Sequence, residues 1–225
     1  MDEVGRMNIF VLDENPEIAA RMYCDKHSPK MVVELLQQLG SSVIRHGATP
    51  EQMPLTKKQT PLKGGYHNHP ATKWCGESRE NYAWASRHAL ELCLEYTRRF
   101  NKIHFCEAGI KHLYSMAYLI PKSNFTPFAL CMPDEFKTFD NEVMSHATAE
   151  RAVKAYRAYY HSKEFAAWNK GTPAPSWWQG EITTTSVKPK VSIKSKSGNT
   201  ERPKARLSPI EKAKLRNMNQ YQMEF

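Results

Sequence analysis

The sequence has little glycine and no long apolar run. Only 10 of its 225 residues are glycine, which excludes collagen-like and Gly/Ser-linker architectures. No stretch approaches the roughly 18 consecutive apolar residues that indicate a transmembrane helix. Residues 1–6 carry two acids and no apolar segment typical of a secretory signal. We therefore expect a cytoplasmic protein with no membrane partner.

Signals for disulfides and for common catalytic sites are also absent. The five cysteines are an odd number without a Cys-x-x-Cys pair, so we expect reduced thiols that pack as small apolar side chains. There is no phosphate-binding glycine-rich loop, no Gly-x-Ser-x-Gly and no His-Glu-x-x-His. The commonest nucleotide-binding, serine-hydrolase and zincin classes therefore lack their motifs, and we expect no cofactor.

What the sequence does contain is an uneven positive charge. Lys and Arg number 32 against 23 Asp and Glu, a net charge of +9. Residues 181–225 hold ten bases and four acids, hence +6, which leaves +3 for residues 1–180. Such a tail attracts a polyanion through counterion release, or it is a solvated segment that aids solubility. We predict duplex DNA as the partner. The tail residues expected to contact it are Lys188, Lys190, Lys194, Lys196, Arg202, Lys204 and Arg206.

Apolar periodicity and capping residues predict a mainly α, compact single-domain helical bundle. A short apolar run at 8–13, expected to be extended, precedes Asn15, a suitable N-cap, and Pro16, suited to the first helical position. This helix is predicted to reach about Leu39, with a kink or a junction of two helices at Pro29. Further helices are predicted from Ser78 to Arg98-Arg99 and over about 105–119, 147–160 and 162–168.

Composition divides the chain into four parts. These are an N-terminal extension (1–6), a globular helical domain (7–180), a basic flexible linker (181–207) and a short basic helix or tail (208–225). The last part begins with Ser208-Pro209-Ile210-Glu211, a capping box, and is a candidate docking element for a protein partner. Trp177 and Trp178 are expected to dock on the core, because adjacent exposed tryptophans are unfavourable.

Polar residues at helical spacing form the first candidate site. Tyr23, His27, Lys30 and Glu34 are separated by four, three and four residues, which places them on one helical face. One interpretation is an ordinary solvent-exposed face. The other is an acid–base–amine cluster, in which His27 moves protons, Lys30 binds phosphate or acts as a nucleophile, and Glu34 orients either one. We take His27, Lys30, Glu34 and Lys26 as the candidate catalytic residues.

The loop containing His67-Asn68-His69 is a candidate phosphate or metal site. Cys24 and His27 have Cys-x-x-His spacing, and the two loop histidines would complete a set of four zinc ligands. This spacing matches no established zinc signature, so we predict no metal. We assign His67, Asn68 and His69 to nucleic-acid binding. The structural alternative is that a histidine here caps a helix.

Arg98 and Arg99 are the remaining candidate DNA contacts. With neighbouring aromatics such as Trp74 and Trp84 they could supply phosphate binding and base stacking. The alternative is that the aromatics belong to the core and that the arginines stabilise a helix C-terminus.

Several motifs resemble a group of small phage-type proteins, mostly uncharacterised, some of which carry the label pyrimidine dimer DNA glycosylase. The resemblance covers about residues 7–178. Its motifs are N-I-F-V-L-D-x-N-P-x-x-A-A-x-x-x-C-D-K-H-x-x-K-M from residue 8, then H-N-H-P-x-x-x-W, E-Y-T-x-R, M-P-D-E-F-K and A-Y-R-A-Y-Y. Membership of a phage-type group would place the protein in the host cell cytoplasm.

A more distant resemblance connects the chain to pyrimidine-dimer glycosylases of the phage endonuclease V type. Ser28-Pro29-Lys30 resembles their Leu-Pro-Arg turn, and residues 65–70 are similar to a Gly-Tyr-Arg-Asn-His-Pro stretch of bacterial relatives. This resemblance implies a compact all-α fold, and attack on the sugar C1′ of damaged DNA by the α-amine of the N-terminal residue. It also implies an imine intermediate and an assisting glutamate on the first helix.

Two departures separate this chain from that pattern. Residues 1–6 precede the matching start, and Met7 is expected to be retained even when translation begins there, because Asn8 is large. The position of the glutamate falls at His27, and Glu34 lies two turns further on. Lys26 or Lys30 is the alternative source of the amine.

Three functions follow as hypotheses. The favoured one is a DNA glycosylase, with or without AP-lyase activity, acting on damaged or modified pyrimidines in duplex DNA. The second is a non-catalytic nucleic-acid-binding or complex-forming phage protein. The third is a metal-assisted enzyme acting on a small nucleotide.

Overall fold

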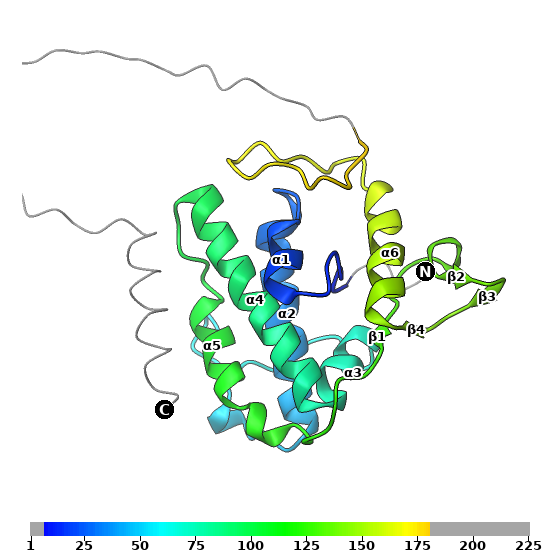
Figure 1. Ribbon diagram of the computed structural model, residues 1–225. Coiled ribbons are helices and arrows are strands. Elements are labelled where there is room, and N and C mark those ends of the chain that lie inside the picture. Colours follow the sequence, from blue (N-terminus) through cyan, green and yellow to red (C-terminus); the bar gives the residue numbers. More distant parts are fainter. Residues whose placement is uncertain (1–6, 181–225) are drawn as a thin grey trace, which may run out of the picture.

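The computed structural model describes residues 7–180, and this part of the chain is mainly α-helical (Figure 1). The predicted fold class is confirmed. The α-helices are α1 (Pro16–Arg21), α2 (His27–Arg45), α3 (Pro70–Glu77), α4 (Arg79–Phe100), α5 (Glu107–Ser115) and α6 (Ala149–His161). Short 3₁₀ helices are η2 (Pro50–Gln52), η3 (Ala117–Leu119) and η4 (Asp134–Phe136). Two antiparallel pairs, β1 (Phe128–Ala129) with β4 (His146–Ala147) and β2 (Thr138–Phe139) with β3 (Glu142–Val143), complete the elements.

The start of α1 agrees with the sequence prediction, but its length does not. Asn15 Oδ1 accepts hydrogen bonds from the backbone N–H groups of Glu17 and Ile18, at 2.9 and 3.0 Å. The helix then ends at Arg21, so a continuous helix to Leu39 is wrong, and the alternative of two helices is confirmed. The break precedes Pro29, which occupies the first turn of α2, where a missing N–H leaves no intrahelical bond unmade.

Other boundaries also differ from the prediction. α2 continues past Gly40 to its end at Arg45, and α3 is an additional short helix. Residues 162–168 form turns instead of a helix, since this segment bonds elsewhere: Ala167 O accepts from Asp25 N at 2.9 Å. Residues 8–13 join no sheet, although residues 8–12 are buried.

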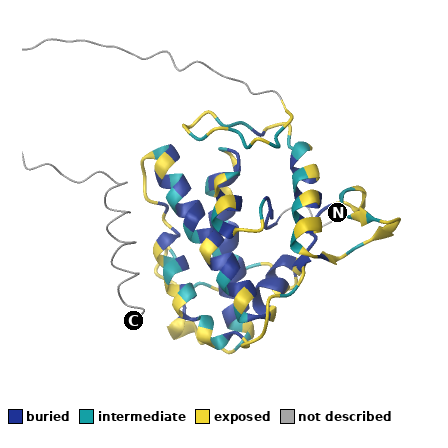
Figure 2. Cartoon of the chain, in the orientation of Figure 1, coloured by how far each residue is buried: buried dark blue, intermediate teal, exposed yellow. Residues whose placement is uncertain are grey.

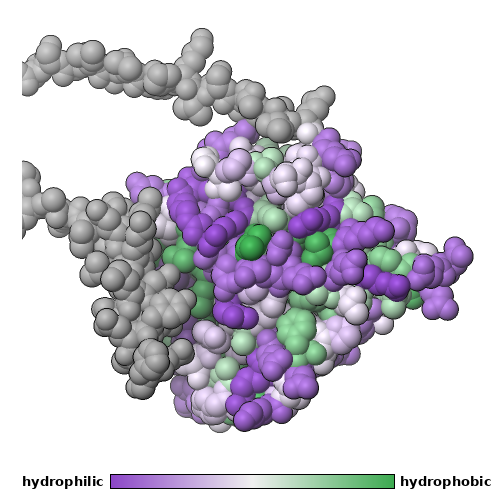
Figure 3. Space-filling model, in the orientation of Figure 1, coloured by the Kyte–Doolittle hydropathy of each residue, from purple (hydrophilic) through white to green (hydrophobic). Residues whose placement is uncertain are grey.

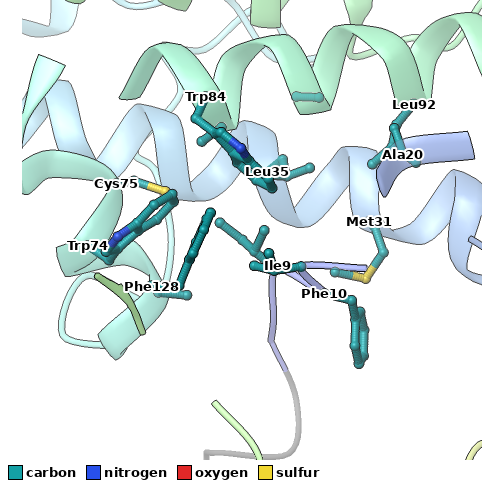
Figure 4. Packing of buried hydrophobic residues seen from close by; sticks show 14 of the residues in the cluster. Ile9, Phe10, Ala20, Met31, Leu35, Trp74, Cys75, Trp84, Leu92 and Phe128 are labelled. Carbon is teal, nitrogen blue, oxygen red and sulfur yellow. The ribbon is translucent and has the colours of Figure 1, made fainter. Parts of the chain in front are cut away.

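α2 and α4 pack against each other at the centre, with α1, α3 and α5 around them (Figure 1). The dark residues in Figure 2 lie on the sides where these helices meet. In Figure 4 the rings of Trp74, Trp84 and Phe128 gather at one end of this core, and Ile9, Phe10 and Met31 gather at the other. The aromatics Trp74 and Trp84 are therefore core residues. All five cysteines are free and buried, as predicted.

The segment after α6 closes over the junction between α1 and α2. Trp168 Nε1 donates to Met22 O at 3.2 Å, and Trp177 and Trp178 pack against the core, as the sequence predicted. The N–H of Asn169 donates to Asp25 Oδ2 at 2.6 Å. These contacts place Lys163 and Phe165 beside the start of α2, where both line a cavity.

Candidate functional site

A small open cavity lies between the N-terminal segment, the first two turns of α2 and the end of α6. Its volume is about 130 Å³. The lining residues are Met7, Asn8, Phe10, His27, Lys30, Met31, Glu34, Tyr159, Lys163 and Phe165. Three of the four candidate catalytic residues, His27, Lys30 and Glu34, therefore share one cavity. The fourth, Lys26, lies at its edge, with its Nζ 4.4 Å from the centre of the Phe165 ring.

Glu34 is a buried carboxylate held by two different donors. Its Oε2 accepts from the backbone N–H of Asn8 at 3.1 Å, and its Oε1 lies 3.0 Å from Lys30 Nζ. Only 9% of the Glu34 side chain is exposed, against 56% of that of Lys30. Burial raises the pKa of Glu34 above its usual range, and the opposing contributions of Lys30 and the Asn8 N–H do not cancel it. This carboxyl can therefore hold and release a proton closer to neutrality than an ordinary glutamate.

His27 is buried and neutral. Burial, together with the positive charges of Lys30, Lys163 and Lys26, lowers the pKa of His27 to about 3. This low pKa disfavours the cationic imidazolium near neutral pH, and the proton-transfer role of His27 stays a prediction. Phe10 stacks on the imidazole ring with 4.9 Å between ring centres.

The hydroxyl of Tyr160 is the hydrogen-bond partner of the His27 ring. Tyr160 Oη accepts from the backbone N–H of Cys24 at 2.9 Å and lies 2.9 Å from His27 Nδ1. Because Tyr160 is fully buried, these contacts hold its hydroxyl and the His27 ring in fixed positions.

The interpretation of this face as solvent-exposed is wrong for three of its four members. Tyr23, His27 and Glu34 are all buried, and Tyr23 precedes α2 instead of belonging to it. The covering groups come from distant parts of the sequence: the N-terminal segment at Asn8 and α6 at Tyr160. Sequence reasoning also missed Lys163 and Phe165, which line the cavity. No periodicity linked that segment to α2.

The His67-Asn68-His69 loop is not among the residues that line this cavity. His69 Nδ1 accepts from the N–H of Ala71 at 3.3 Å and caps α3, which is the structural alternative considered above. Asn68 and His67 are exposed, and the carbonyl of His67 accepts from Arg45. Within residues 7–180 no group of three or more His, Cys, Asp or Glu side chains could hold a metal ion, so Cys24, His27, His67 and His69 do not assemble into a site.

The two arginines at the end of α4 have intramolecular partners. The Arg99 side chain is fully buried between Glu95 and Asp25, with N–O distances of 2.8 and 3.1 Å. This burial removes Arg99 from any phosphate-binding surface. Arg98 is 42% exposed and pairs with Glu91 and Glu95. The cluster links α4 to the junction between α1 and α2.

The predicted DNA-contacting lysines and arginines of residues 188–206, and the predicted helix at 209–220, lie outside the described residues. In the described part, no helix is long and apolar enough to cross a membrane. The face of the domain in Figure 3 is mostly hydrophilic, with scattered apolar residues. No family model, no curated protein and no solved structure matches this chain.

Proposed function

We propose that the protein is a DNA glycosylase that acts on damaged or modified pyrimidines in duplex DNA, with Glu34 as its acid–base group. The observation that carries the proposal is the position of the Glu34 carboxyl, buried beside both an ammonium group and the N-terminal segment. The sequence resemblance and the basic tail support the choice of DNA as substrate. A group of this kind assists departure of a base and formation of an amine adduct at C1′.

Two nitrogens are placed to supply the amine. Lys30 Nζ is 3.0 Å from Glu34 Oε1. The backbone nitrogen of Asn8 is 3.1 Å from Oε2, so a chain that began at Asn8 would present its α-amine to the same carboxyl. An α-amine has a pKa near 8 and is a better nucleophile at neutral pH than an ordinary lysine. With either amine, the assisting carboxyl is Glu34. His27 occupies the position that corresponds to the glutamate of the endonuclease V-type glycosylases.

The proposed step exchanges one bond at C1′ for another. The amine nitrogen forms a bond to C1′ while the bond between C1′ and the base nitrogen breaks. The departing base takes a proton from the Glu34 carboxyl, and the resulting carboxylate then accepts a proton from the attacking nitrogen. Opening of the sugar ring gives a protonated imine as O4′ takes up the proton that Glu34 had accepted. Loss of a C2′ proton to the Glu34 carboxylate then breaks the C3′–O bond, and departure of the phosphate nicks the strand. The Nε2–H of His27 donates a hydrogen bond to a sugar or phosphate oxygen in the cavity.

The test is a trapping experiment with full-length protein. Duplexes that contain one pyrimidine dimer or one abasic site are incubated with and without borohydride, which reduces an imine to a stable covalent adduct. The expected result is a nicked strand and a trapped complex, in which mass spectrometry locates the modified nitrogen. Salt-sensitive binding without nicking or trapping would contradict the proposal and favour a non-catalytic DNA-binding protein.

Matched variants separate the two amines. Lys30→Arg keeps the charge beside Glu34 but removes the nucleophilic amine, and Lys26→Arg is its control at the edge of the cavity. Forms of the chain that begin at Met1, Met7 and Asn8, the last released from a fusion by a protease, test the α-amine. Trapping that is lost in Lys30→Arg identifies the lysine. Trapping that appears only in the form beginning at Asn8 identifies the α-amine.

A further inference from the structure

A second and larger hollow lies on a different side of α2. Its volume is about 770 Å³, within the range of small-molecule sites. Val33, Leu36 and Gln37 of α2 line it, whereas His27 and Glu34 line the candidate active site. We call this hollow the α2–α5 groove. Its other lining residues are Pro54, Leu55, Thr56, Lys57, Lys58, Thr60, Leu62, Phe105, Cys106, Ala108, Gly109 and His112.

One wall of the groove is a short loop that is closed by its own hydrogen bonds. The N–H of Leu62 donates to Pro54 O at 2.9 Å, and the N–H of Thr56 donates to Thr60 O at 2.8 Å. His112 of α5 donates from Nε2 to Gln52 O at 2.7 Å, which ties the loop to the opposite wall. The groove is therefore held open by fixed contacts, and a ligand would not have to order this wall.

Gly109 has no side chain, and this leaves space in the groove. A Cβ at this position of α5 would lie 3.0 Å from Leu36 Cδ1 and 3.7 Å from Pro54 Cβ. A larger residue would therefore fill space between α5, α2 and the loop.

The lining combines apolar side chains with positive charge. Leu55 and Phe105 are 60% and 57% exposed, although both are large and apolar. The charged or titratable residues in the lining are Lys57, Lys58, His112 and the buried Cys106 thiol, with no Asp or Glu among them. An occupant that covers the apolar surface and also carries a negative group would match both properties.

The groove suits a nucleobase poorly. Base binding by stacking needs an open aromatic face. Phe105 is the aromatic residue of the lining, and its ring already has Lys57 Nζ 3.9 Å from its centre. His104 stacks on the same ring with 4.8 Å between centres. The remaining apolar part of the lining is aliphatic, which favours a hydrocarbon chain.

We propose that the α2–α5 groove binds a small anionic amphiphile, with its hydrocarbon part against Val33, Leu36 and Leu55 and its acidic group at Lys57 and Lys58. The site is separate from the cavity at Glu34, so binding here does not depend on the proposed glycosylase activity.

The probe is dodecanoate, with 1-dodecanol and dodecyltrimethylammonium as neutral and cationic compounds of the same chain length. Each is titrated into ¹⁵N-labelled full-length protein below its micellar concentration, and amide shifts and calorimetric affinity are recorded. Dodecanoate is expected to shift amides of the 54–62 loop and of 105–112. It should bind about three- to tenfold more tightly than the alcohol, as expected for two exposed charge contacts.

Two variants test the geometry. Ala108→Trp fills the groove at an exposed position of α5 and should weaken dodecanoate binding at least about tenfold while leaving the thermal midpoint unchanged. Lys57→Ala/Lys58→Ala should remove the preference for dodecanoate over the alcohol, and Lys122→Ala/Lys170→Ala, at exposed lysines outside the lining, should retain it. Equal affinity for all three head groups, amide shifts elsewhere, or no binding would overturn the proposal.

Discussion

Two buried glutamates in this protein have the same chemistry but opposite electrostatic outcomes. Burial acts to raise the pKa of Glu95, but hydrogen bonds from Thr172 and Arg99 and the charges of Arg99 and Arg98 outweigh it, so the pKa of Glu95 is lowered. Burial also raises the pKa of Glu34, and there the single half-exposed lysine and one backbone N–H are not sufficient to reverse the effect.

The difference lies in the number and burial of the cationic partners. Glu95 contacts the fully buried guanidinium of Arg99 in fixed geometry, whereas the Lys30 ammonium is largely solvated. The arginines therefore keep Glu95 ionised, and the ion pairs of this cluster stabilise the fold. Burial raises the pKa of the Glu34 carboxyl, which is the direction expected of an acid–base group. The following experiments test this contrast, from the largest expected effect to the smallest.

Glu34→Gln is expected to lower the rate of strand nicking about 10²- to 10⁴-fold, the usual contribution of a general acid–base group. The amide preserves the shape of the side chain and the acceptor for the Asn8 N–H but cannot exchange a proton. Single-turnover kinetics on the abasic duplex measure the effect, and urea unfolding is the control for folding. A variant that is folded and fully active would remove Glu34 from the mechanism.

Arg99→Met is expected to lower the free energy of unfolding by about 3–5 kcal/mol, because it removes the buried guanidinium that Glu95 and the partly buried Asp25 share. Among the described residues, Glu95 then keeps only the half-exposed Arg98 and the Thr172 hydroxyl. Arg98→Met is the matched control. Its side chain is 42% exposed, so the loss should be about 1 kcal/mol or less. Urea denaturation of both variants gives the comparison. Equal losses of unfolding free energy in the two variants would show that burial of the arginine does not determine its contribution to stability.

Acid is expected to destabilise the fold through its buried histidines. Burial lowers the pKa of His88 to about 4 and, together with nearby lysines, that of His27 to about 3. In the unfolded chain both titrate near 6.5, so the unfolded state binds more protons between those values. Stability is complete above about pH 6.5 and falls as pH decreases, by at most about 3 kcal/mol for His88.

Urea midpoints at pH 7.5 and pH 4.5 check this effect, with His88→Gln as the variant. His88 Nδ1 lies 2.8 Å from Pro16 O, and Nε2 lies 3.0 Å from Tyr23 Oη. The variant should be less stable at neutral pH but lose less on acidification. The same loss of stability on acidification in both proteins would mean that folding does not lower the pKa of His88.

Thr172→Val has the smallest expected effect. The Thr172 hydroxyl donates to Glu95 Oε1, and this bond attaches the segment after α6 to α4. Its removal should cost about 1 kcal/mol, because Glu95 keeps its arginine partners. Thermal denaturation measures the loss. A loss as large as that of Arg99→Met would show that the Glu95 cluster is stabilised as much by the segment after α6 as by the arginine of α4.

Part of the site could be predicted from the sequence, because helical spacing alone relates His27, Lys30 and Glu34. Their burial could not. It depends on Asn8, 26 residues before Glu34, and on Tyr160, 133 residues after His27. The same limit explains Arg99, whose sequence position at a helix end suggested a surface charge. Its partner Asp25 lies 74 residues away and turns it into a core residue.

The sequence by itself determined the helical class and the places where α1 and α4 begin. Asn15 and Ser78 accept backbone hydrogen bonds from their own first turns, and such caps are local interactions. It also determined that the cysteines would be buried and that Trp177 and Trp178 would pack against the core, because their transfer out of water is favourable in any compact fold. Only the tertiary structure decided which face of α2 lines the cavity at Glu34 and which lines the α2–α5 groove. That choice follows from segments that meet across the fold, and their packing sets the burial that determines each pKa.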